Sequence, residues 1–115
     1  HHLSDSHSNA LIRFKLALTE ENPTIKPYTE DLWAELIDGI DDDISYSLLI
    51  LKGLHHKWHL LLVSMDESHW ERSYFHPESK KTVTLEEMIG LYAWHGKHHL
   101  AHIQQALEYK GEFEL

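Results

Sequence analysis

Two histidines on the apolar side of one predicted helix most constrain how this chain can fold. At about 3.6 residues per turn, His95 and His99 lie one turn apart on the same face of that helix. The same face carries Leu85, Met88, Ile89, Tyr92, Ile103, Ala106 and Leu107. Two neutral imidazoles in this register can both turn a nitrogen toward one ion. The pattern therefore predicts a metal site on an otherwise apolar helix.

A different interpretation of these histidines is that each hydrogen-bonds to a neighbour in the core or lies on the surface. We favour the metal site because two histidines share one apolar stripe in register. His98 and His102 have the same spacing, but His98 falls outside the stripe and His102 lies at its edge. This second pair is the weaker candidate.

The composition limits the class of protein. With 115 residues, the chain is predicted to form a single domain over residues 1–115. It has no cysteine, which excludes disulfides, thiolate zinc sites and a cysteine nucleophile. The net charge of −9 argues against a nucleic-acid surface, which needs clustered lysine and arginine. No apolar run approaches the roughly 20 residues of a membrane span and no signal peptide is visible, so we expect a cytoplasmic protein.

Three long helical segments are predicted, and together they favour an all-α fold. The first runs from the start of the chain to about Leu18, the second from about Ile44 to Met65, and the third from Thr84 to about Tyr109. They are compatible with antiparallel packing and leave the architecture one helix short of a four-helix bundle. The apolar face of the first consists of Leu3, His7, Ala10, Phe14, Ala17 and Leu18, and that of the second of Ile44, Leu48, Leu51, His55, Trp58 and Leu62.

Two connections join these segments. In the first, from Glu20 to Asp43, Thr29 is predicted to cap a short helix that ends near Leu36. A connection of this length in a small domain is often a lid or a pocket wall. The second, from Asp66 to Thr84, is interpreted as a loop with extended pieces.

A polar stripe lies beside the apolar face of the first segment, where the rim of a pocket would be. It consists of His2, Ser6, Asn9 and Arg13. The alternative is a solvated surface, with Arg13 in a surface ion pair. On the second segment, His55 lies on the side predicted to be buried, where a single histidine is more often a core residue than a ligand.

Several motifs occur in the order in which a known family has them. They are His1-His2-Leu3-Ser4-Asp5-Ser6-His7, Arg13 to Glu21, Pro27-Tyr28 with Trp33, Phe75-His76-Pro77, and Gly90 to His95 with His102-Ile103. Over nearly its whole length the chain resembles the DinB superfamily, and within it the YfiT-like branch, whose members are described as metal-dependent hydrolases.

The resemblance implies a four-helix bundle in which three histidines hold a metal ion. One comes from the second helix of the family and two from the fourth, and by motif they match His2, His95 and His99. Zinc suits an all-imidazole site, with nickel next. The first family helix has no counterpart here, so we expect the chain to be incomplete at its N-terminus.

Three neutral histidines leave open positions on a divalent ion for water or substrate, which is typical of a catalytic site. Bound water would have a pKa near about 7 and could attack a small-molecule substrate. No residue is identified as the general base, and His55 is the histidine considered for it. Candidates for contacts with the ligands or the substrate are Asp5, Ser6, Asn9, Arg13, His55 and Tyr92.

The resemblance leaves two other functions open. Relatives transfer low-molecular-weight thiols such as bacillithiol, mycothiol or glutathione, and the metal would then bind the incoming thiolate. The third hypothesis is a stress-related metal-binding bundle without turnover, in which a fourth protein ligand such as His55 or Asp5 closes the site. We also expect a homodimer, since apolar surface left by an absent helix promotes self-association.

Overall fold

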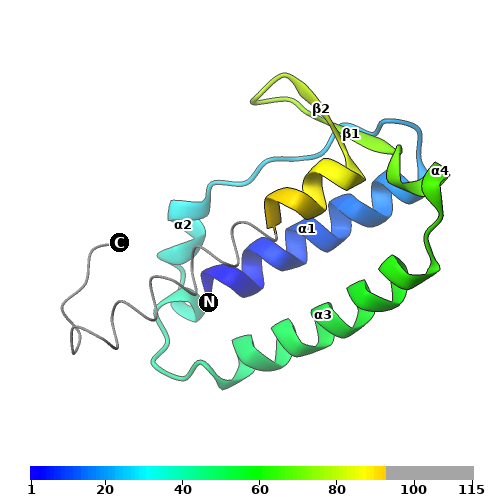
Figure 1. Cartoon of the computed structure of the whole chain (residues 1–115). Helices are drawn as coiled ribbons and strands as arrows, with labels where there is room; N and C mark the ends of the chain where they lie inside the picture. The colour runs from blue at the N-terminus through cyan, green and yellow to red at the C-terminus, as the bar shows by residue number, and fades with distance from the viewer. Residues whose placement is uncertain (93–115) are drawn as a thin grey trace, which may run out of the picture. The chain divides into compact units, whose positions relative to one another are not determined.

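The computed structural model describes residues 1–92 and is mostly helical, as the sequence predicts. The elements are α1 (His2–Thr19), α2 (Glu30–Ala34), the 3-10 helix η1 (Ile37–Gly39), α3 (Ser45–Ser64), α4 (Glu67–Trp70), β1 (Ser73–His76) and β2 (Lys81–Thr84) (Figure 1). Residues 85–92 are also helical. His1–Leu85 form one compact unit, and Glu86 begins a second. No helix in the described part is long and apolar enough to cross a membrane.

The two long helices α1 and α3 pack against each other in parallel (Figure 1). His1 contacts Ser47 near the start of both helices, and Phe14 contacts Trp58 further along both. The partners therefore advance in the same direction, so the prediction of antiparallel neighbours is wrong for this pair. Parallel neighbours need a connection that returns the chain to its starting end. The segment between Thr19 and Ser45 makes that return.

The core lies between α1, α3 and the hairpin. Phe14 is fully buried, and its ring meets Trp58 edge-on at 5.7 Å between centroids with an interplanar angle of 71°. This T-shaped contact is a favoured aromatic geometry. The buried apolar residues of this unit are Ala10, Leu11, Phe14, Ala17, Ile25, Trp58, Tyr74 and Leu85.

The predicted buried face is confirmed for the middle of α1 but wrong for much of α3. Ala10, Phe14 and Ala17 are buried, whereas Ile44 and Leu48 are 54% and 55% exposed. Two members of the predicted stripe, His55 and Trp58, contact α1, so the stripe faces that helix but is only partly covered by it. Trp58 is the buried residue of α3.

An arginine completes the C-terminal end of α1. The last carbonyl groups of a helix have no partner within it and need donors from elsewhere. The guanidinium of Arg72 donates from Nε to the carbonyl oxygen of Ala17 at 2.6 Å and from Nη2 to that of Glu20 at 2.9 Å. A cation at this end also complements the helix dipole. Arg72 thereby ties the start of the hairpin to α1.

The second connection contains a short helix and a β-hairpin. Asp66 accepts from the backbone N–H groups of Ser68 and His69 at the start of α4, and the Ser68 hydroxyl lowers the pKa of this carboxyl. β1 and β2 then pair antiparallel, from Ser73↔Thr84 to His76↔Lys81. The sequence predicted a loop with extended pieces between Asp66 and Thr84. The structure shows that two of these extended pieces pair with each other as a β-hairpin.

The hairpin is joined to the segment that follows α1. Phe75 donates its backbone N–H to the carbonyl oxygen of Pro23 at 2.8 Å and accepts from Ile25 at 3.0 Å. Thr29 occupies the N-cap position of α2, but its side chain makes no capping hydrogen bond, contrary to the predicted cap. The long connection is thus held near its start by Phe75.

Replacement of Phe14 by alanine tests whether the contact between α1 and α3 determines stability. We expect the free energy of unfolding to fall by about 3–5 kcal/mol, because a fully buried ring leaves a cavity. Denaturant unfolding measures the change. Ile12→Ala is the matched control on the same helix, since Ile12 is 59% exposed and its removal costs little. Equal losses in the two variants would contradict this account of the core.

Candidate functional site

His2 lies at an exposed position on the first turn of α1. An imidazole nitrogen is a common ligand of divalent ions. His95 and His99 lie outside the described residues. Among residues 1–92, no group of three or more histidines and carboxylates is arranged to hold a metal ion. Of the three predicted ligands, only His2 lies in the described part of the chain, and its role as a ligand stays a prediction.

Asp5 lies one turn after His2, in surroundings that disfavour the negative charge of its carboxylate. Burial raises the pKa of the Asp5 carboxyl, and the negative charge of Asp38 raises it further. The positive charges of the N-terminal amine and His2 act in the opposite direction. Asp5, Asp38 and His2 are thus close enough for their charges to interact.

The remaining residues of the predicted polar stripe differ in their surroundings. Ser6 is buried, although it was placed on the pocket rim, because its side of α1 faces inward. Asn9 is half-buried and donates from Nδ2 to the carbonyl oxygen of Asp5 at 2.9 Å. Arg13 is half-buried and points toward the carbonyl oxygen of Lys26 at 3.4 Å, so it meets backbone and no acidic partner in this contact. Of the four residues of the stripe, only His2 is exposed to solvent.

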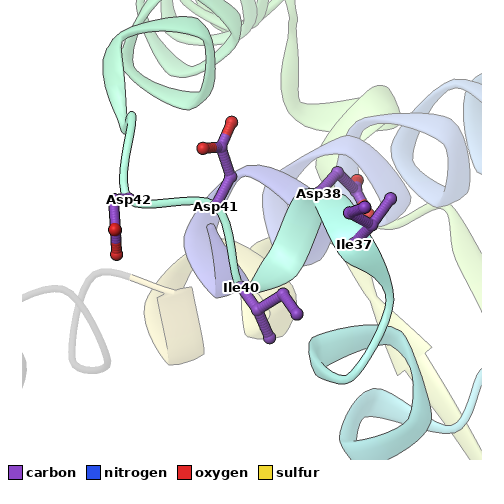
Figure 2. A pocket seen from close by; sticks show the side chains of 5 residues that line it. All are labelled: Ile37, Asp38, Ile40, Asp41 and Asp42. Carbon is purple, nitrogen blue, oxygen red and sulfur yellow. The ribbon is translucent and has the colours of Figure 1, made fainter.

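An acidic loop lies beside this end of α1. His1 donates from Nε2 to the carbonyl oxygen of Asp41 at 2.7 Å, and its Nδ1 contacts the Ser47 hydroxyl at 2.5 Å. These bonds join the first turn of α1 to the loop and to the start of α3. The loop surrounds an open hollow of about 620 Å³ (Figure 2). It is lined by Ile37, Asp38, Ile40, Asp41 and Asp42.

The loop ends where α3 begins, and a local hydrogen bond sets that boundary. Asp43 accepts from the backbone N–H of Ser45 at 2.9 Å and from its hydroxyl at 2.6 Å. These bonds lower the pKa of the Asp43 carboxyl, the hydroxyl contributing most. The three consecutive aspartates of the loop, Asp41 to Asp43, thus lead directly into α3. The hydrogen bond from His1 places Asp41 beside the first turn of α1, and no local pattern in the sequence indicates that contact.

His55 is exposed, so the prediction that it is buried is wrong. It still faces α1, where its Nε2 lies 2.8 Å from Nδ1 of His7. His55 lies about one turn before Trp58, the buried residue of α3. Tyr92 is helical and half-buried, in the second unit of the chain. The sequence placed His7 and His55 on inward faces of two helices, but not beside each other.

Comparison with protein families identifies the chain. Residues 1–103 match the sequence profile of the DinB superfamily. The chain belongs to the DinB superfamily. This confirms the resemblance inferred from the histidine and aromatic motifs.

Similar members of the DinB superfamily come from bacilli. YfiT of Bacillus subtilis is 50% identical over 91% of this chain, a Bacillus mycoides protein is 53% identical over 94%, and an Oceanobacillus iheyensis protein is 54% identical over 90%. All three carry the provisional name of metal-dependent hydrolase. The chain spans 59%, 61% and 59% of their respective lengths.

A solved structure of Bacillus subtilis YfiT has the same fold. It matches 96% of this chain with a TM-score of 0.91 and 48% identity, and this chain covers 63% of it. YfiT is described as a probable metal-dependent hydrolase with an unusual four-helix bundle topology. The DinB-type bundle predicted from the sequence is therefore confirmed as the fold to which this chain belongs.

Substitution of Asp38 by asparagine tests the electrostatics around His2. We expect the pKa of Asp5 to fall, because one cause of its elevation is removed. A raised pKa means that the folded chain binds this proton more readily than the unfolded chain, so the stability penalty is complete at neutral pH and relieved as the pH falls. The variant should therefore gain stability at neutral pH but not in acid.

Carboxyl carbon NMR of Asp5 across pH measures the change. Asp31→Asn, on the exposed surface of α2, is the control and should leave the titration of Asp5 in place. An unchanged titration in Asp38→Asn would show that the two carboxyls do not interact.

Proposed function

We propose that this chain forms the metal-binding part of a DinB-type hydrolase, with His2, His95 and His99 holding one divalent ion. The observation that carries the proposal is the exposed imidazole of His2 on the helix turn that His1 joins to an open acidic hollow, in a chain 50% identical to YfiT. Zinc or nickel is the proposed ion, because imidazole nitrogens suit both. The chain spans less than two thirds of the length of its relatives, so hydrolase activity is proposed for it and is not inferred from their names.

Each described residue has a separate task in this proposal. When bound, the ion would polarise a small-molecule substrate and lower the pKa of water, as open three-histidine sites do. His2 would hold the ion from α1. Asp5 would balance the positive charge at His2. His1 would keep the loop around Asp41 beside them through its hydrogen bond to the loop backbone.

The charge around His2 favours hydrolysis over thiol transfer. Asp38, Asp41 and Asp42 line the hollow, and Asp5 lies close to Asp38. A negative potential repels anions and lowers their local concentration. A thiolate, or a thiol that carries carboxylates as glutathione does, would meet this repulsion. A neutral or cationic ester or amide would not, so we propose substrates of that kind.

Metal analysis tests the ligand set. The purified chain should hold close to one zinc or nickel ion, and His2→Ala, His95→Ala and His99→Ala should each weaken binding by more than about 100-fold, because even residues behind the ligands contribute 10- to 100-fold. Elemental analysis and competition with a chelator measure both quantities. His56→Ala on the exposed side of α3 is the control and should bind as the parent does. Metal that survives all three substitutions would exclude this site.

Substrate charge tests the proposed reaction. At low salt and without added thiol, the metal-loaded chain should hydrolyse a cationic ester about tenfold faster than its anionic analogue, and salt should reduce the ratio. Asp41→Asn combined with Asp42→Asn should reduce it too, whereas Asp31→Asn should not. Turnover that requires a thiol, or a preference for the anionic ester, would instead support thiol transfer.

A further inference from the structure

Two histidines form a direct link between α1 and α3. Nδ1 of His7 and Nε2 of His55 are 2.8 Å apart, and the ring centroids are 5.0 Å apart. The His7 ring also meets Trp58 edge-on at 6.2 Å, and Trp58 is 7% exposed. The link therefore borders the aromatic contact that joins the two helices.

The proton count of this pair determines whether the contact attracts or repels. A nitrogen pair at this distance is a hydrogen bond when one nitrogen carries a proton and the other offers its lone pair. Two neutral rings can satisfy this condition, and so can one neutral ring with one cationic ring. Two cationic rings cannot, since both nitrogens then donate and both rings are positive.

We propose that the His7–His55 pair is a proton-sensitive link between α1 and α3, which holds with at most one added proton and opens with two. The unfolded chain has no such restriction and takes up a proton on each histidine. Toward about pH 5, where both imidazoles of the unfolded chain are protonated, the folded state therefore holds one proton fewer than the unfolded state. Its stability falls as the pH falls.

Other ionisable groups lie on the elements around the pair and bear on how it is tested. Asp5 is on α1 near His7, and β1, which packs on α1, contributes His76. On α3, the ionisable residues within about a turn of His55 are Lys52, His56, Lys57 and His59. A test must remove the titration of the pair while leaving these groups in place.

The His7→Asn and His55→Gln double variant meets that requirement. The amide of asparagine replaces Nδ1 and the amide of glutamine replaces Nε2, so a hydrogen bond can form without a titrating ring. Denaturant unfolding of the full chain at several pH values, with a chelator present, measures stability. On acidification, the unfolding constant of the parent should rise by up to about tenfold more per pH unit than that of the double variant, since one proton separates the states.

A matched substitution and a direct measurement complete the test. His56→Gln removes an exposed neighbouring histidine and should keep the pH dependence of the parent. Equal pH dependence in the parent and the double variant, or an equal effect of His56→Gln, would overturn the proposal. Should the double variant fail to fold, imidazole nitrogen NMR of the parent and of His7→Asn provides the answer. The titration curve of His55 should change when His7 is replaced, and an unchanged curve would refute the link.

Discussion

The contact between Phe14 and Trp58 is the interaction on which the rest of the described structure depends. It joins the two longest helices, and both rings are almost fully removed from solvent. The contacts between α1 and α3 nearer the starts of both helices are polar. His1 with Ser47 lies near the helix starts, and His7 with His55 borders the aromatic rings. An apolar contact that is not directional is thus accompanied, toward the helix starts, by hydrogen bonds that select one alignment of the helices.

This alignment also assembles the surroundings of His2. Because α3 begins beside the first turn of α1, the loop before α3 must end there, and its aspartates come with it. The negative charges around His2 therefore follow from the way the helices pair. At the other end of α1, Arg72 plays a corresponding part, since it holds the hairpin against the last turn of the helix.

The sequence predicted the features that depend on local periodicity. The ends of α1 and α3, the buried residues Phe14 and Trp58, and the family were all correct. It did not predict the parallel pairing of the helices. Nor did it predict backbone hydrogen bonds between residues far apart in sequence, such as Pro23 and Phe75. Contacts of that kind join residues far apart in the chain, and no local pattern records them. For the site, the choice of His2 as a ligand stays a prediction, and the neighbourhood of Asp38 could not be predicted because it depends on tertiary contacts.

The parallel arrangement of α1 and α3 has a kinetic consequence. Contacting residues on the two helices are 46 and 48 positions apart, whereas neighbours in a simple helical hairpin are close in sequence. The chain must close this long loop before Phe14 and Trp58 can meet, and the entropy of closure is lost before the contact is gained. Proteins with such distant contacts fold more slowly than helical bundles with short loops. This domain is helical in content, but its folding speed is set by a topology more typical of proteins that pair distant strands.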